Sequence, residues 1–175
     1  MKSQLILFKS AILPYLTYCH LVWHFCKASD TRRLERLQER RLRAVFKDNN
    51  SNYEQLLEKA DLPTLLNRRL QDLCTIKYEV RHKLCPAYIS NIFKEPNSNY
   101  NLRQADFSIL KFETVTYGKH SIRYLGPRLW TKLPKTIRDI TTLMSFKGKI
   151  RQLSISELAV ASVPLDFYIF LLLIP

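Results

Sequence analysis

Apolar side chains recur at helical spacing along most of the first 94 residues, and the clearest run covers residues 30–47. The positions that share one side, at about 100° per residue, are Leu34, Leu37, Leu42, Val45 and Phe46. Ser29 or Asp30 can cap the start of this run, because a short polar side chain accepts a hydrogen bond from the first free N–H groups. The pattern predicts an amphipathic helix over residues 30–47.

The same periodicity, together with proline, predicts the helices that follow. Residues 52–60 form a short run that ends before Leu62-Pro63. Residues 64–84 form a longer run, whose apolar face consists of Leu65, Leu66, Leu70, Leu73, Ile76, Val80 and Leu84. Pro86 ends that run, because proline cannot continue a helix, but it suits the first turn of a short helix over 86–93.

The first segment, residues 3–27, is apolar and aromatic, and Pro14 interrupts it. We expect two short buried helices or one kinked helix here, because proline removes a backbone donor and clashes with the preceding turn. No cap precedes the segment, which is typical of a truncated start.

Residues 94–118 have a different character. A turn-like stretch leads into FETVTY, whose β-branched and aromatic residues favour a short strand or an extended arm. Gly126-Pro127 and Pro134 then allow only short helices, and a last basic helix is expected over residues 142–153.

The expected fold class is therefore mainly α. We predict a helical bundle of four to six helices, with a short irregular or β segment near 105–118 and an appended apolar tail. The chain is expected to contain a helical region (1–94), a basic irregular and helical region (95–154) and the tail (155–175).

Net charge changes the picture most, since the chain has a formal net charge of +13. Residues 97–154 contain 11 Lys+Arg against the acids Asp106, Glu113 and Asp139. Such an excess repels itself and attracts nucleic acid or an anionic membrane. The alternative is a merely soluble basic protein.

A basic stripe lies on the predicted helix 30–47, opposite its apolar side. Its members are Arg32, Arg33, Arg36, Arg40, Arg43 and Lys47. Spacing of three and four residues along one face could follow a phosphate backbone, which gives affinity with little sequence choice. The alternative is a solvated face balanced by Glu35 and Glu39 at its edge. Arg41 falls on the apolar side, where its alkyl chain can lie along the surface with the charge in water.

A second set of basic and aromatic residues lies nearer the C-terminus. It comprises Tyr117, Lys119, His120, Arg123, Tyr124, Arg128, Trp130 and Lys132, followed by Lys147, Lys149 and Arg151 on the last helix. The aromatic rings could stack on bases while the cations hold phosphates. They could equally be anchors of a small core.

No catalytic or metal centre is predicted. Cys19, His20, His24 and Cys26 crowd together, and His82 and Cys85 form an i, i+3 pair, but these spacings match no zinc finger or knuckle. With only 3 Gly residues the chain has no Gly-rich phosphate loop, and no Asp-Asp pair is available to hold two metal ions. We expect no cofactor.

The apolar tail and the cysteines indicate where in the cell the protein is expected. The last 18 residues are apolar enough to suggest a membrane anchor, but Pro164 and Asp166 break the run. Four cysteines without a disulfide framework favour reduced thiols in a cytoplasmic or nuclear setting. A membrane association is not expected.

Seven strings of sequence stand out together. They are AILPYLTYCHLVWHFC (11–26), RRLERLQERRLRAVFKD (32–48), YEQLLEKADLPTLLNRRLQDL (53–73), LCPAYISNIFK (84–94), YNLR (100–103), TYGKHSIRYLGPRLWTKLP (116–134) and SFKGKIRQL (145–153). In this order and spacing they resemble the segment that follows the polymerase core in non-LTR (LINE-type, jockey/CR1-like) retrotransposon reverse transcriptases, in copies like those of cnidarian genomes. The resemblance covers residues 3–154, and the tail departs from it.

The resemblance implies a C-terminal, thumb and post-thumb part of an RNA-directed DNA polymerase, with residues 1–94 as a thumb-like region. The polymerase and endonuclease regions of the parent protein would be the missing partners, and RNA or RNA–DNA duplex the ligand. No catalytic residue is carried over, because the family's Asp-Asp motif lies outside this stretch. Two alternatives stay open: a non-functional relic or helical protein-interaction module, and a small protein anchored to a membrane by residues 158–175.

Overall fold

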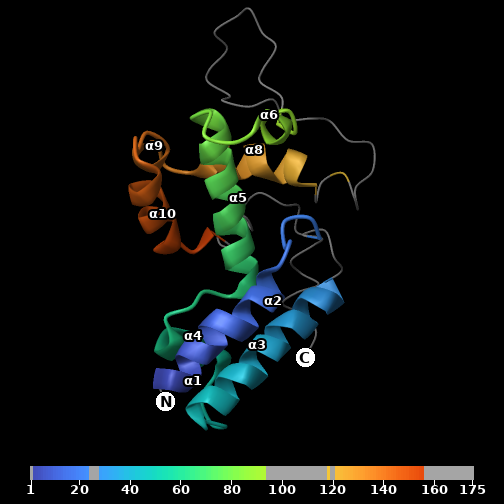
Figure 1. Ribbon diagram of the computed structural model, residues 1–175, viewed down its shortest axis with the longest axis vertical. Coiled ribbons are helices and arrows are strands. Elements are labelled where there is room, and N and C mark those ends of the chain that lie inside the picture. Colours follow the sequence, from blue (N-terminus) through green and yellow to red (C-terminus); the bar gives the residue numbers. More distant parts are fainter. Residues whose placement is uncertain (1, 24–27, 94–117, 119–120, 156–175) are drawn as a thin grey trace, which may run out of the picture. The chain divides into compact units, whose positions relative to one another are not determined.

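The fold is described from a computed structural model, which defines residues 2–23, 28–93, 118 and 121–155 (Figure 1). Every regular element within these ranges is helical, so the prediction of a mainly α chain is confirmed. The expected β or irregular segment near 105–118 lies, apart from Gly118, outside the described residues, and so does the tail after Ile155. The chain divides into two compact units, Met1–Arg69 and Leu70–Pro175.

The first unit opens with one helical run that changes its winding before Pro14. Helix α1 (Lys2–Leu7) passes into the π-helical segment η1 (Phe8–Ile12) and then into α2 (Leu13–Thr17). Pro14 occupies the first turn of α2, where its missing N–H costs least, and the wider π turn precedes it. The sequence left two short buried helices or one kinked helix open. The segment is one uninterrupted helical run, of which only Phe8 and Leu13 are buried before Thr17.

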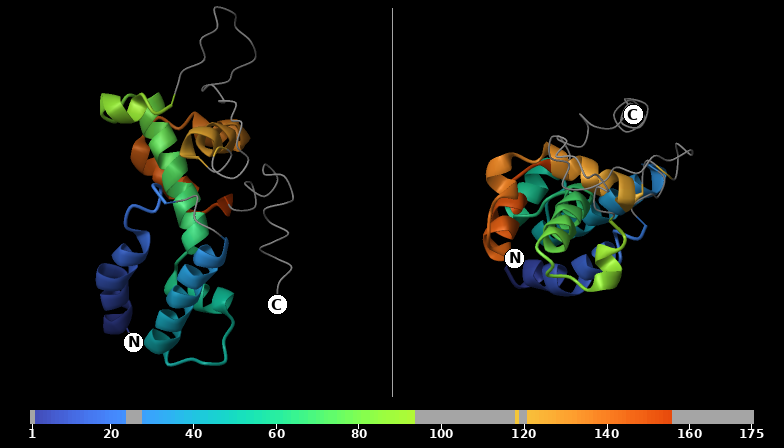
Figure 2. Two further views of the ribbon diagram at one scale, coloured as in Figure 1. Left: turned by 90° about the vertical axis from the view of Figure 1, so that its right-hand side faces the viewer. Right: turned by 90° about the horizontal axis from the view of Figure 1, so that it is seen from above.

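The core of the first unit forms where this run and α4 (Tyr53–Ala60) pack against α3 (Ala28–Phe46). Figures 1 and 2 show the run lying alongside α3. The buried apolar residues are Phe8, Leu13, Leu42, Val45, Leu56, Leu57, Ala60 and Leu65. The predicted helices over 30–47 and 52–60 are thus confirmed to within two residues at each end.

The predicted apolar side of α3 is wrong at one position. Leu37 is 44% exposed, whereas its neighbour Gln38 is fully buried. The buried arc centres on Gln38 and Leu42, and Leu37 stands about 100° away from Gln38 on the helix. Gln38 is accommodated because its Nε2–H donates to the carbonyl oxygen of Pro63 at 3.3 Å.

Helix α5 (Leu65–Arg81) ends earlier than the pattern predicted. Lys83 adopts a left-handed backbone (φ 55°), the Leu84 N–H donates to the Glu79 carbonyl at 2.8 Å, and the Lys83 N–H donates to Val80 at 3.1 Å. These two bonds define a Schellman C-cap. Leu84, expected on the apolar face, is therefore past the helix and 59% exposed.

The second unit packs α8 (Ile122–Lys132) and α10 (Leu143–Arg151) against α5, with the short helices α6 (Ala87–Ser90) and α9 (Lys135–Arg138) beside them (Figure 2). The Tyr78 ring stacks on Phe146 with centroids 4.3 Å apart, and its hydroxyl donates to the Ile140 carbonyl at 2.9 Å. Gln71 donates from Nε2 to the Arg151 and Leu153 carbonyls at 3.4 and 3.3 Å. The end of α10 is thereby tied to α5.

Helix α8 is longer than expected, because Pro127 lies inside it and does not end it. The Ser121 hydroxyl caps its start by accepting from the Arg123 N–H at 3.3 Å. Leu125, Leu129 and Trp130 are buried along one side. This burial outweighs the one backbone hydrogen bond that proline removes.

Two helical glycines give a matched prediction. A Cβ on Gly126 would lie 3.1 Å from Phe93 Cε1 and 3.2 Å from Lys77 Cδ, whereas one on Gly148 would meet nothing within 4 Å. We expect Gly126→Ala to destabilise the protein by about 1–2 kcal/mol through overpacking. We expect Gly148→Ala to stabilise it by about 0.5–1 kcal/mol through helix propensity. Urea unfolding followed by circular dichroism measures both, and equal effects would contradict the packing of α8 on α5.

The turn after α3 is organised by Asp48, whose carboxylate accepts from Lys59 Nζ at 2.6 Å, the Ser51 hydroxyl at 2.5 Å and the Asn50 N–H at 3.1 Å. Lys59 and Ser51 hold the pKa of Asp48 well below its usual 3.8. A carboxyl with a depressed folded-state pKa stabilises the protein above its unfolded pKa, and the stabilisation is lost as the pH falls through the folded pKa.

Asp48→Asn is therefore expected to lower stability at pH 5–7 and to lose this effect progressively below about pH 4. Urea unfolding of both proteins at several pH values measures it. A difference of the same size at pH 2 and pH 7 would contradict the ion pair.

Candidate nucleic-acid interface

Helix α3 presents the basic stripe on the side away from the buried core. On the helical wheel the stripe is centred about 150° from the midpoint of the buried residues Gln38 and Leu42. Arg33, Arg36 and Arg40 are exposed, while Arg32 and Arg43 are half-buried. Lys47, exposed, follows the last residue of α3 and has a left-handed backbone (φ 53°).

Arg43 and Arg33 of the basic stripe pair with acids on the same helix. Arg43 donates to Glu39 Oε1 at 2.7 Å from Nη2, and its Nη1 donates to the Asn49 carbonyl at 2.8 Å. Arg33 lies 3.6 Å from Asp30, and both side chains of that pair are largely exposed. An exposed ion pair of this kind is worth little, so it yields readily to a phosphate.

The alternative interpretation of the stripe, a solvated face balanced by Glu35 and Glu39, requires Glu35 to lie beside the arginines, but Glu35 has other partners. Its carboxylate accepts from the Tyr53 hydroxyl at 2.6 Å, the Leu65 N–H at 3.3 Å and the Leu66 N–H at 3.0 Å. It thus caps the first turn of α5, where the helix dipole favours a negative charge. Burial and the Glu35 charge together raise the pKa of Tyr53 far above its usual value.

Because Glu35 turns inward, a positive surface remains on α3. Arg36, Arg40, Arg41 and Lys47 make no ion pair with any residue that the structure describes. From Arg33 to Lys47 the stripe spans about 21 Å, over which one strand of duplex DNA presents about six phosphates. Its length and charge suit backbone contacts, which position a duplex without reading its sequence.

The second predicted set is only partly described. Lys119, Tyr117 and His120 lie outside the described residues. Arg123 is exposed in the first turn of α8, and Arg128 donates to the Tyr124 hydroxyl at 2.6 Å. The pKa of Lys132 is lowered, because partial burial removes water and Arg128 one turn earlier repels its charge.

The aromatic part of this set does not offer a stacking surface at Trp130. Its side chain is 0% exposed and lies 6.0 Å from the Phe146 ring, so Trp130 is a core anchor. On α10, Lys147 pairs with Glu79 at 3.3 Å, while Lys149 and Arg151 are exposed. The described cations of this unit are therefore more dispersed than those of α3.

Of the cysteines and histidines singled out in the sequence, His24 and Cys26 lie outside the described residues and Cys19 is exposed, whereas His82 and Cys85 have packing partners. His82 stacks on Tyr78 with ring centroids 4.2 Å apart, and Cys85 Sγ lies 3.3 Å from the Ser90 hydroxyl. Burial raises the pKa of the Cys74 thiol to about 12, which keeps it protonated and unreactive. Within the described ranges no three His, Cys, Asp or Glu side chains converge to hold a metal ion.

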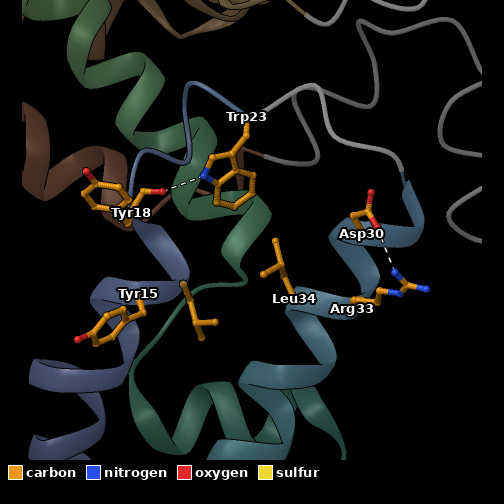
Figure 3. A pocket seen from close by; sticks show the side chains of 7 residues that line it. Tyr15, Tyr18, Trp23, Asp30, Arg33 and Leu34 are labelled. Carbon is orange, nitrogen blue, oxygen red and sulfur yellow. Dashed lines mark hydrogen bonds and ion pairs between the residues drawn. The ribbon is translucent and has the colours of Figure 1, made fainter.

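An open pocket of about 540 Å³ lies between α2 and the start of α3 (Figure 3). Its lining residues are Tyr15, Leu16, Tyr18, Trp23, Asp30, Arg33 and Leu34. The sequence pattern places Tyr15, Tyr18 and Trp23 in a buried segment, whereas Tyr15 and Tyr18 are exposed in the structure. The one feature of the sequence that could have indicated this pocket is the nearness of these aromatic residues to the first arginines of the stripe.

Among the described helices, none combines the length and the apolar character that a membrane span requires. No family model matches this chain, and no curated protein or solved structure matches it. Function is therefore inferred from the geometry above and from the resemblance in the sequence.

Proposed function

We propose that this chain binds RNA or RNA–DNA duplex without sequence specificity, through the basic stripe of α3. It acts as the thumb-side part of a retrotransposon-like RNA-directed DNA polymerase and holds the duplex. The catalytic carboxylates belong to another region of that enzyme. The observation that carries the proposal is the inward turn of Glu35, which leaves Arg36, Arg40 and Lys47 without a described counter-charge.

Electrostatics supports a polyanionic ligand. The five arginines of the stripe lie on one face of a 19-residue helix, and Lys47 directly follows its last residue. This geometry fits repeated phosphates better than a single small anion. Arginine also binds phosphate in a bidentate manner, which makes five arginines and one lysine a stronger phosphate surface than lysines alone. The basic residues Arg123, Lys149 and Arg151 of the second unit add further positive charge.

The test is fluorescence-anisotropy binding of the full chain to two RNA–DNA duplexes of equal length and unrelated sequence at about 50 mM salt. The proposal predicts tight binding to both, with dissociation constants within about threefold of each other. A strong preference for one sequence would contradict backbone recognition. Absence of binding at this salt concentration would contradict the proposed function altogether.

A further inference from the structure

We propose that the outer side of the first helical run docks an amphipathic helix with acidic flanks, presented by a partner protein. This inference goes beyond the proposed function, because this side of α1, η1 and α2 contains none of the arginines of the basic stripe. The exposed apolar residues on it are called the outer face, and they are Ile6, Leu7, Ala11, Pro14, Tyr15 and Tyr18.

The outer face is strongly exposed although its side chains are apolar. Ile6 and Leu7 are 66% and 61% exposed, and Tyr15 and Tyr18 are 85% and 76% exposed. Figure 3 shows the rings of both tyrosines pointing away from α3. The opposite side of the run lies in the core of the first unit. A helix that is apolar on both sides is normally covered on both sides, so the outer face is a surface for another element.

The π-helical segment η1 keeps the outer face straight. In an α-helix, residues four apart differ by about 40° around the axis, so Leu7, Ala11 and Tyr15 would drift around the run. The wider turn of η1 reduces this drift, which leaves the small Ala11 in line between two large side chains. Beside it, the Ser10 hydroxyl donates to the Leu7 carbonyl at 3.4 Å. A gap between two large residues accepts a large side chain from a neighbouring helix.

Charge complementarity identifies the flanks of the partner helix. Lys2 and Lys9 are exposed, and each lies one helical turn from Ile6, so both stand on one flank of the outer face. Residues 1–29 contain no Asp or Glu, and residues 10–23 contain no Lys or Arg either. The rim of this face is therefore only cationic. Two carboxylates seven residues apart on a partner helix have the same spacing as the two lysines and set its register.

Two other occupants fit this face less well. A second copy of the chain would bring the lysines of both copies together, with no acid on either face to offset them. An anionic membrane is held by clusters of roughly four to eight basic residues, and this face has two. The basic stripe cannot complete such a cluster, because it lies on the side of α3 away from the core that α3 shares with the run.

The experiment uses two labelled helical peptides of about 18 residues, which is long enough to span the outer face. Both have leucines at heptad spacing, and the flanking positions are Glu in one peptide and Lys in the other. At about 50 mM salt the Glu peptide should bind the full chain at least about tenfold more tightly than the Lys peptide. Equal affinities would overturn the acidic partner, and no binding of either peptide would overturn the docking face.

A charge exchange tests the rim. Lys2→Glu with Lys9→Glu should reverse the preference, so that the Lys peptide binds more tightly than the Glu peptide. Both lysines are exposed, and the fold should not change. An unchanged preference for the Glu peptide would overturn the assignment of the two lysines.

Variants of the apolar residues separate the outer face from the basic stripe. Leu7→Ser with Tyr15→Ser should abolish binding of the Glu peptide and leave duplex affinity unchanged. Tyr88→Ser, which removes another ring that is 71% exposed, should change neither and serves as the matched control. Arg36→Glu with Arg40→Glu should weaken duplex binding and leave the Leu7- and Tyr15-dependent peptide binding in place. Loss of peptide binding in this variant alone would place the peptide on the stripe and overturn the proposal.

The same Leu7→Ser, Tyr15→Ser variant tests the other occupants. Sedimentation velocity of the full chain, and co-sedimentation with vesicles of phosphatidylserine and phosphatidylcholine, should give the same result for this variant and for wild type. A loss of self-association in the variant would assign the outer face to a second copy. A loss of vesicle binding would assign it to a lipid surface, and either loss would overturn the proposal.

Discussion

Reversing two charges of the basic stripe, Arg36→Glu with Arg40→Glu, is expected to weaken binding of an RNA–DNA duplex about 100-fold at 50 mM salt. Each substitution removes one phosphate contact and adds one repulsive charge. Both side chains are exposed and make no ion pair with a described residue, so the fold should not change. The slope of log K against log salt should also flatten by about 2.

The matched control reverses the same number of charges elsewhere in the same unit. Lys2→Glu with Lys9→Glu changes two exposed lysines of α1 and η1 and leaves α3 intact. We expect this control to lower affinity less than tenfold, by the change in net charge alone. Equal losses in the two double variants would show that net charge, and not the stripe, determines binding.

Glu35→Ala is expected to lower the free energy of unfolding by about 3 kcal/mol, because it removes a charged acceptor from three donors at once. The Leu65 and Leu66 N–H groups would lose their cap, and the half-buried Tyr53 hydroxyl would lose its partner. For a domain whose total stability is about 5–15 kcal/mol, this is a large fraction. Urea unfolding at neutral pH measures the loss.

Two companion variants test the cause. Glu58→Ala on α4 removes an exposed carboxylate without a described side-chain partner, and its effect should stay within about 0.5 kcal/mol. Glu35→Gln keeps a neutral acceptor and should fall between wild type and Glu35→Ala. If Glu35→Ala is as mild as Glu58→Ala, the carboxylate does not cap α5, and it is then available to balance the basic stripe.

The helices were the part of the fold most open to prediction from the sequence. Residues 30–47 and 52–60 have strong apolar periodicity, and the observed α3 and α4 agree with them to within two residues at each end. The predicted cap is wrong, because α3 begins at Ala28 and both Ser29 and Asp30 lie inside its first turn. The division of α3 into a basic and an apolar arc was also predictable, since it depends only on 100° per residue. Leu37 shows the limit of this periodicity. It lies at the edge of the apolar arc, where burial depends on which neighbouring helices pack there.

Features that depend on contacts distant in sequence could not be predicted. The role of Glu35 as a cap requires α3 and the start of α5, 30 residues later, to meet. The burial of Trp130 depends on α10, and the tolerance of Pro127 depends on the apolar surface that α8 buries. The open pocket was missed for the same reason, because its lining residues come from α2, from residues 18–23 and from α3.

The most direct test of the account is the salt dependence of duplex binding by the wild-type chain, between about 50 and 200 mM salt. Six phosphate contacts along the basic stripe predict a loss of affinity of about 1,000-fold or more over this range. A dissociation constant that changes by less than about tenfold would mean fewer than about two such contacts. That result would contradict backbone binding by the stripe.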